Sequence, residues 1–419
     1  MNILVIGSGG REHTLFQKLT ESPHADKVYA IPGNPGMGEM TDISVEDNAE
    51  ILRFAKEKEI GLVVVGPEVP LMNGLVDELE SAGIRAFGPR ANAAEIEGSK
   101  SFAKDLMKKY GIPTARYEVF TKAEPARAYI RREGAPIVVK ADGLAAGKGV
   151  IVAMSEQEAL DAVNAIMEDN SFGDAGARVV IEEFMEGEEA SLLAFTDGKT
   201  IRPMISAQDH KRAFDGDKGP NTGGMGTYAP APVMTPEMID RATEEILKPT
   251  IAAMEKEGRL YSGCLYLGLM ITEKGPKVVE FNARFGDPET QVVLPLLDGD
   301  LIQIMCACAD GTLADVPIHW KDGAAVCVVL AAGGYPASYE KGNEIHGIAD
   351  AEKTGALVFH AGTAEKEGKL VTNGGRVLGV VGMGEDIASA VHSAYAAVEK
   401  ISFKDAYYRK DIAHRALHR

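Results

Sequence analysis

A carboxylate and an amide stand two positions apart in the most informative stretch of the sequence, VVEFNARFGDPET, which begins at residue 278. Alternation along a strand places Glu280 and Asn282 on one face, and Val279 and Phe281 then face away. Carboxylate and amide oxygens are hard ligands that suit Mg²⁺ beside phosphates. Arg284 lies two positions further on, so the same alternation places it on the face of Glu280 and Asn282. Its positive charge can balance that of a carboxylate or of a migrating phosphoryl group. A β-hairpin with a ladder of salt bridges is the alternative interpretation.

The stretch 138–150, VVKADGLAAGKGV, combines a strand, a loop of small residues and a second strand. Its glycines let the backbone approach a ligand closely. Lys140 on the strand and Lys148 in the loop add positive charge, so we expect the loop to fold over triphosphate oxygens. The spacing is not that of a Walker A loop. A long exposed hairpin with surface lysines is the alternative.

The stretch 180–188, VIEEFMEGE, is an apolar strand that ends in acidic residues. Backbone groups at a strand end can bind the edge of an adenine, and the carboxylate of Glu188 can accept hydrogen bonds from ribose hydroxyls. Solvated acids after a strand are the alternative. The candidate nucleotide contacts here are Glu182, Phe184 and Glu188.

Two neighbouring segments, 207–214 and 219–226, form a polar, glycine-rich loop that suits capture of a small zwitterion. His210 is either a base or a hydrogen-bonded spectator. In this loop the candidate catalytic residues are Asp209 and Lys211, and the candidate substrate-binding residues are Asn221, Thr222 and Gly223.

The N-terminal loop GSGGRE follows a strand and opens a helix, which directs backbone N–H groups at an anion. A dinucleotide site would need a third glycine where Glu12 stands, for close packing of helix on strand, and an acidic residue after the second strand. A phosphate site reinforced by Arg11 is therefore favoured over NAD or FAD binding and over a purely structural turn. Turns 34–36 and 66–68 follow neighbouring strands, at the sheet edge where ligands bind. The candidate substrate-binding residues are Gly9, Gly10, Arg11, Glu12, Asn34, Gly66, Pro67 and Glu68.

Apolar runs separated by helix-length polar stretches predict a parallel α/β sheet in the first hundred residues. Its expected strands are 2–7, 27–31, 62–66 and 85–88, and its helices 11–20, 48–57 and 71–82. Helices are then expected at 99–110, 156–167 and 236–256, with strands at 137–140, 149–153, 179–183, 264–271 and 276–282. A last α/β unit has strands at 324–332, 356–361 and 376–383 and a helix at 387–401.

Bulk properties agree with a multidomain globular protein. The chain has 419 residues, 45% of them hydrophobic and 25% charged, which predicts two to four domains. A net charge of −18 argues against a nucleic-acid partner. No apolar run is long enough for a membrane span, and no export signal opens the chain, so we expect a cytoplasmic protein with four reduced cysteines.

Seven segments in this order resemble the phosphoribosylamine–glycine ligase family of the ATP-grasp superfamily, and the resemblance covers nearly the whole chain. They are residues 7–13, 66–68, 139–150, 208–226, 280–291, 360–363 (HAGT) and 374–378 (GGRVL). The resemblance implies ligation of glycine to 5-phosphoribosylamine at the expense of ATP, in the second step of purine synthesis, through a glycyl phosphate.

The resemblance also implies an α/β fold with three parts. These are a Rossmann-like parallel-sheet domain at 1–105, a two-lobed ATP-grasp domain at 106–315 with its small lobe at about 118–190, and a C-terminal α/β domain at 316–419. We also expect no nucleic-acid or membrane partner, and a monomer or weak dimer.

By family pattern, Glu280 and Asn282 correspond to ligands of Mg²⁺ or Mn²⁺, and Lys104 and Lys140 to nucleotide contacts. Arg284 would stabilise the acyl phosphate. Asp209 and Asp287 would hold the ammonium group of glycine, and the sugar phosphate would lie on Gly9, Gly10 and Arg11. The strand at 265–270 lacks the acid that ATP-grasp enzymes often place before the metal strand.

Three alternatives stay open at this point. They are another ATP-grasp ligase of purine synthesis that uses bicarbonate or formate, a dinucleotide-dependent oxidoreductase and a non-catalytic nucleotide-binding regulator.

Overall fold

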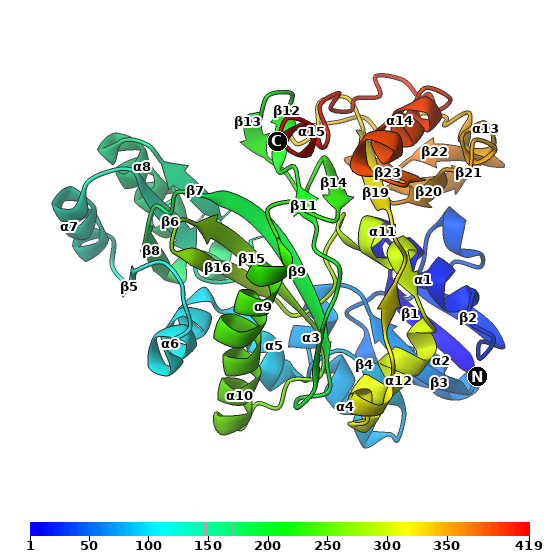
Figure 1. Cartoon of the computed structure of the whole chain (residues 1–419), viewed down its shortest axis with the longest axis horizontal. Coiled ribbons are helices and arrows are strands. Elements are labelled where there is room, and N and C mark those ends of the chain that lie inside the picture. Colours follow the sequence, from blue (N-terminus) through cyan, green and yellow to red (C-terminus); the bar gives the residue numbers. More distant parts are fainter. Residues whose placement is uncertain (146–148, 170) are drawn as a thin grey trace.

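The structure, a computed structural model, describes residues 1–145, 149–169 and 171–419 (Figure 1). The N-terminal unit is a parallel sheet in the order β2-β1-β3-β4. Its strands are β1 (Asn2–Gly7), β2 (Lys27–Pro32), β3 (Ile60–Val65) and β4 (Arg85–Phe87), and its helices include α1 (Gly10–Thr20) and α2 (Asn48–Glu57). The predicted strands and these two helices are confirmed. The predicted single helix 71–82 is wrong, because Gly74 takes a left-handed conformation between α3 (Glu68–Met72) and α4 (Leu75–Ser81).

A small antiparallel sheet with two helices projects from the rest of the chain (Figure 1). Its order is β5-β8-β6-β7, with β5 (Tyr117–Phe120), β6 (Ile137–Ala141), β7 (Val150–Ala153) and β8 (Val179–Glu183). Helices α7 (Ala123–Glu133) and α8 (Glu156–Met167) share its apolar core. Ser155 and Glu158 form a capping box that starts α8.

A second antiparallel sheet carries the predicted metal-binding strand. Its order is β10-β9-β15-β16, with β9 (Glu188–Thr196), β10 (Ile201–Pro203), β15 (Gly263–Thr272) and β16 (Gly275–Asn282). The predicted helix 236–256 consists of α9 (Pro236–Ala242) and α10 (Lys248–Lys256), joined by a wider π turn over Thr243–Leu247. Pro249 explains the wider turn, since it has no amide hydrogen to donate within the helix.

The last sheet has the order β11-β14-β19-β23-β20 and combines two parts of the chain. Strands β11 (Gln208–Asp209) and β14 (Gly226–Ala229) come from the glycine-rich loop, and they flank the hairpin β12 (Arg212–Phe214) and β13 (Lys218–Asn221). The others are β19 (Ala324–Ala331), β20 (Leu357–His360) and β23 (Arg376–Gly384), covered by α14 (Ile387–Val398). The sheet thus contains strands from both sides of the predicted boundary at 315/316.

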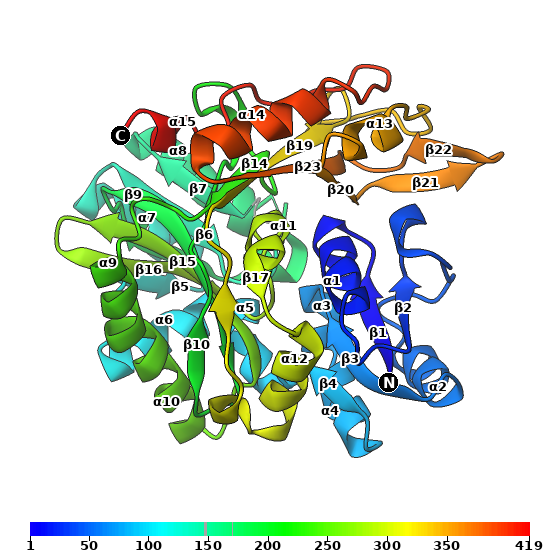
Figure 2. The same cartoon turned by 45° about the vertical axis from the view of Figure 1, so that its right-hand side comes forward.

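Three further features bear on the predictions. Figure 2 shows the C-terminal sheet above the N-terminal unit, where β20 contacts α1. All four cysteines are free, and Cys306 and Cys308 lie on α12 (Leu301–Asp310). In the described part of the chain, no helix has the length and apolar character needed to cross a membrane.

Candidate active site

A cleft of about 1610 Å³ opens between the two antiparallel sheets, the N-terminal unit and the C-terminal residues. Most of the side chains that the sequence singled out line it. They are Arg11, Glu68, Lys104, Lys140, Glu182, Phe184, Glu188, Asp209, Lys211, Asn221, Thr222, Gly223, Glu280, Asn282, Arg284 and Asp287. One cleft therefore gathers the residues predicted for nucleotide, metal and amino-acid binding.

Six other predicted residues are not among those that line the cleft. They are Gly9, Gly10, Glu12, Asn34, Gly66 and Pro67. Lys148, predicted to reach the triphosphate, lies outside the described residues.

Glu12 fits tightly at the helix start, where a dinucleotide fold would have glycine. Its carboxylate accepts hydrogen bonds from the Gly9 amide at 2.8 Å and from Arg11 Nε at 2.6 Å. A Cβ atom at Gly7 or Gly66 would lie 2.3 or 2.2 Å from the Glu12 side chain. The glycines therefore make room for Glu12, and a carboxylate already caps the first turn of α1.

Asn34 joins the N-terminal and C-terminal units. Its side-chain amide donates to the carbonyl of Ser8 at 2.8 Å and to that of His360 at 2.9 Å. The amide of His360 in turn donates to Nδ1 of His13 at 2.8 Å. Burial lowers the pKa of His13 to about 3, so this ring is neutral and can accept that bond.

Two lysines share one buried carboxylate beside the cleft. Lys104 on α6 (Lys100–Tyr110) lies 3.1 Å from Glu182, and Lys140 on β6 lies 2.9 Å from the other oxygen of Glu182. Lys104 also donates to Thr114 at 2.7 Å. Burial lowers the pKa of Lys104 to about 8. The two ammonium groups are thus held in fixed positions next to the nucleotide stretch.

Glu280 carries its charge deep in the cleft. Burial alone would raise the pKa of Glu280, but the positive charges of Lys211, Lys140 and Lys100 lower it below its ordinary value. The predicted alternation of β16 is interrupted, because Val279 is an extra residue in the pairing with β15. Val279 and Phe281, which were both predicted to face away, line the cleft as well.

The donor set fits a Mg²⁺-type ion that is shared with a phosphate substrate. Glu280 and Asn282 offer a carboxylate and an amide oxygen on one strand end. Across the described residues, no three His, Cys, Asp or Glu side chains gather as a metal site. Mg²⁺ commonly takes one or two carboxylates and completes its shell with phosphate oxygens and water. The small set of protein ligands is compatible with that arrangement.

Asp209 at the end of β11 stands among other charges. Burial raises the pKa of Asp209 to about 7, and the carboxylates of Glu289, Glu189 and Glu280 add to the rise, while Lys211 opposes it. Lys211 donates to Glu189 at 3.1 Å, and the nearby carboxylates raise the pKa of Lys211 well above its ordinary value. Lys211 is therefore a permanent cation, whereas Asp209 titrates near neutrality.

Asp287 links the N-terminal loop to Arg376. One carboxylate oxygen accepts from the Arg11 amide at 3.3 Å, and the other lies 3.4 Å from the Arg376 guanidinium. Although burial opposes ionisation, these two arginines lower the pKa of Asp287. Arg376 also donates to the carbonyl of Gly223 at 2.8 Å.

Arg284 is held between two carboxylates. It donates to Glu68 at 2.9 Å and lies 3.0 Å from Glu97. Glu97 also accepts from the amide of Ala283 at 2.7 Å. Burial raises the pKa of Glu97 even though Arg284 opposes the rise, and both carboxylates raise the pKa of Arg284, against the effect of burial.

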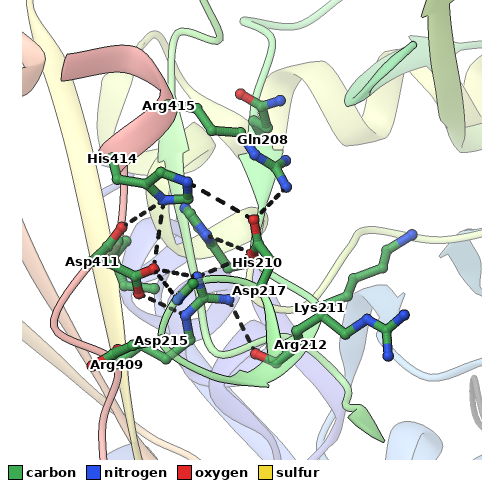
Figure 3. Close-up of polar contacts among 12 residues, drawn as sticks. Gln208, His210, Lys211, Arg212, Asp215, Asp217, Arg409, Asp411, His414 and Arg415 are labelled. Atoms are coloured by element: carbon green, nitrogen blue, oxygen red, sulfur yellow. Dashed lines mark hydrogen bonds and ion pairs between the residues drawn. The ribbon is translucent and has the colours of Figure 1, made fainter. Parts of the chain in front are cut away.

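His210 is a hydrogen-bond acceptor in the fold (Figure 3). Its Nε2 accepts from the amide of Ala413 at 3.0 Å, and burial lowers the pKa of the ring. The spectator interpretation therefore fits the structure better than a catalytic base.

Several cleft residues were not identified from the sequence. Glu289 and Arg376 lie inside the motifs 280–291 and 374–378, which had already been singled out from the sequence. Their position and charge within those motifs could have identified them as site residues. Lys100 lies in the predicted helix 99–110. Glu97 had no local signal, because its partner Arg284 is remote in sequence. Among the charged residues missed are Glu97, Lys100, Glu289, Arg376, Arg415 and Arg419.

Two antiparallel sheets that enclose a cleft rich in lysines and acids define the ATP-grasp class, and the predicted fold class is confirmed. Profiles of the phosphoribosylglycinamide synthetase family match its N domain to residues 1–97, its ATP-grasp (A) domain to 98–290 and its C domain to 325–415. The chain belongs to this family, and it is a ligase.

Relatives span the whole chain. A phosphoribosylamine–glycine ligase of Agrobacterium fabrum is 53% identical over 422 residues, which is 100% of this chain and 99% of that protein. The trifunctional purine biosynthetic protein adenosine-3 of Gallus gallus is 54% identical over 99% of this chain and 42% of its own length.

Solved structures agree with these relatives. A phosphoribosylamine–glycine ligase of Thermotoga maritima has a TM-score of 0.87 and 38% identity, and the match covers 99% of this chain and 100% of that one. A biotin carboxylase domain of Hydrogenobacter thermophilus with MgADP has a TM-score of 0.71 and 16% identity, over 97% of this chain and 91% of that chain. The second match shows a shared fold.

Proposed function

We propose that this cleft joins glycine to 5-phosphoribosylamine and cleaves ATP only as part of this ligation. The products are glycinamide ribonucleotide, ADP and phosphate. The observation that carries the proposal is the convergence, in one cleft of a member of this family, of residues suited to ATP, to a metal ion and to glycine, with Arg11 and Glu68 of the N-terminal unit at the same cleft.

On the nucleotide side, Lys104 and Lys140 neutralise phosphate oxygens of ATP. They are held by Glu182 at 3.1 and 2.9 Å, so little reorganisation is needed when the substrate binds. Phe184 lies in the segment between β8 and β9 that lines the cleft, beside backbone groups that bind adenine. Glu188, the first residue of β9, accepts hydrogen bonds from the ribose hydroxyls.

Glu280 and Asn282 would hold Mg²⁺ or Mn²⁺. Such an ion would supply positive charge to the phosphate oxygens when it is bound. The lowered pKa of Glu280, which lysine charges maintain against burial, keeps this ligand ionised.

Glycine binds with its ammonium group toward Asp209 and Asp287 and its carboxylate toward Arg284 and Lys211. A carboxylate oxygen of glycine attacks the γ-phosphorus, and the bond to the β–γ bridging oxygen breaks, which releases ADP and leaves glycyl phosphate. Water would hydrolyse this mixed anhydride, so the closed cleft must exclude solvent.

The neutral amine of phosphoribosylamine then attacks the glycyl carbonyl carbon. The bond from carbon to the phosphate oxygen breaks, and the amine nitrogen loses one proton, which the departing phosphate takes up. The sugar phosphate lies by the N-terminal loop, near Gly9, Gly10 and Arg11. Carboxylates of Glu12 and Asp287 already accept from this loop, so the phosphate must bind beside them or displace Asp287.

The test is ADP release measured with each substrate omitted in turn. We expect sustained ADP formation only when ATP, glycine, phosphoribosylamine and the divalent ion are all present. ADP formation that continues without glycine would refute the proposal and favour a ligase for another carboxylate. A cytoplasmic location and a monomer or weak dimer stay predictions, and light scattering in solution tests the second.

A further inference from the structure

Residues 409–419 form a segment that packs against the β12–β13 hairpin at the edge of the cleft (Figure 3). Arg409 is completely buried and lies 2.8 Å from Asp411 and 3.1 Å from Asp217. It also donates to the carbonyl of Arg212 at 3.1 Å. A buried guanidinium with this many partners fixes the start of the segment to the hairpin.

Further contacts continue along the segment. The amide of Lys410 donates to Asp215 at 2.8 Å, and the amide of Ala413 donates to His210 at 3.0 Å. Arg415 lies 2.8 Å from Asp217. The chain is therefore anchored on both sides of Ala413, and its last residues extend over the nucleotide side of the cleft.

Those last residues reach Glu188, the proposed ribose acceptor. One carboxylate oxygen of Glu188 lies 2.9 Å from the Arg419 guanidinium, and the other accepts from the side-chain amide of Gln208 at 3.0 Å. Gln208 is itself fixed, because it donates to the carbonyl of Glu189 at 2.7 Å and accepts from Tyr228. Each oxygen of Glu188 thus has one donor from a different part of the chain.

We propose that Arg419 is a positioning residue of the nucleotide subsite, which orients the Glu188 carboxylate toward the ribose hydroxyls. This inference rests on the proposed role of Glu188. A side chain that is ordered before the ligand arrives loses no rotamer freedom on binding, so affinity rises without a new contact.

The ion pair between Arg419 and Glu188 contributes little to the stability of the fold. Its side chains are 43% and 29% exposed, and ion pairs of that kind contribute little to folding. Removing Arg419 therefore leaves the fold intact and isolates its effect on the ligand.

The experiment compares Arg419→Ala, Arg419→Lys and Glu188→Ala for the KM of ATP and of 2′,3′-dideoxy-ATP. We expect Arg419→Ala to raise the KM of ATP about two- to ten-fold, the effect of freeing one side chain. The KM of the dideoxy analogue and kcat should stay unchanged, and Arg419→Lys should restore part of the difference. Arg85→Ala is the matched control, because Arg85 forms a similarly exposed pair with Asp310, at 46% and 40%, away from the cleft.

The outcomes separate this inference from the proposed role of Glu188. If Glu188→Ala leaves the preference for ATP over the dideoxy analogue intact, Glu188 does not bind the ribose and both ideas fail. If Glu188→Ala abolishes the preference and Arg419→Ala does not change it, only the role of Arg419 is refuted. A lower KM of ATP in Arg419→Ala would also overturn it, since Arg419 would then compete with the nucleotide.

Discussion

Glycine capture by this cleft should weaken as the pH falls, because the carboxyl group proposed to receive the ammonium group titrates near neutrality. Burial and neighbouring carboxylates raise the pKa of Asp209 to about 7. Only the ionised form attracts an ammonium group, so binding is strong above this pKa and is lost below it. Lys211, with a pKa raised well above its ordinary value, and Glu280, with a lowered pKa, keep their charges through this range.

The magnitude follows from the ionised fraction of Asp209. With a pKa of about 7, this fraction is roughly one-tenth near pH 6 and nine-tenths near pH 8, so the apparent dissociation constant of glycine differs about ten-fold between them. Asp209→Asn removes the titrating group. It should raise the KM of glycine by about ten- to hundred-fold, which corresponds to one charged hydrogen bond, and should flatten the pH dependence.

The assay is equilibrium binding of glycine to the enzyme saturated with a non-hydrolysable ATP analogue and Mg²⁺, between about pH 6 and pH 8. Leaving phosphoribosylamine out removes its own titration, and glycine stays zwitterionic throughout. Binding of the ATP analogue, measured at the same pH values, is the control. Glycine affinity that does not change with pH in the unaltered enzyme, or that changes equally in Asp209→Asn, would refute this reasoning.

Three further predictions concern other parts of the cleft. Glu280→Gln should lower kcat by about 10²-fold at limiting Mg²⁺ with an unchanged melting temperature; near-normal turnover would remove the metal assignment. Gly10→Trp, whose Cβ would lie 2.6 Å from Gln291, should raise the KM of phosphoribosylamine at least about ten-fold and leave that of ATP unchanged; equal weakening of both would indicate a structural turn. Glu182→Gln leaves two buried lysines without their shared carboxylate and should cost about 3–5 kcal/mol of unfolding free energy, measured by denaturant titration; an unchanged midpoint would contradict the ion triad.

Local pattern was enough to predict the strands of the N-terminal sheet and to identify residues most of which line one cleft. The apolar runs of β1 and β3 are buried on both faces, as expected for parallel strands covered by helices. The stretch around Glu280 was identified because period-2 spacing and residue type agree in the same few positions.

Non-local pairing explains what the sequence did not predict. Strand β9 opens with two acidic residues, and it is stabilised by β15, which is about seventy residues away. The short strand β14 read as loop, because its partner β19 lies about a hundred residues downstream, and β11 in turn pairs with β14. The interruption at Val279 likewise depends on the register with β15. The residues of each strand alone give no indication of these distant partners.

An acidic protein that binds polyanions must keep its cations in place when the substrates are absent, and the cleft does so with internal carboxylates. Glu182 lies between Lys104 and Lys140, while Glu68 and Glu97 lie on Arg284. A cation without such a partner would be buried at a large desolvation cost. The carboxylates therefore reduce the attraction for phosphate, but they also fix the cations where transferred charge develops. The charge balance thus favours pre-organisation over raw affinity, which is the condition for stabilising a phosphoryl transition state more than the bound nucleotide.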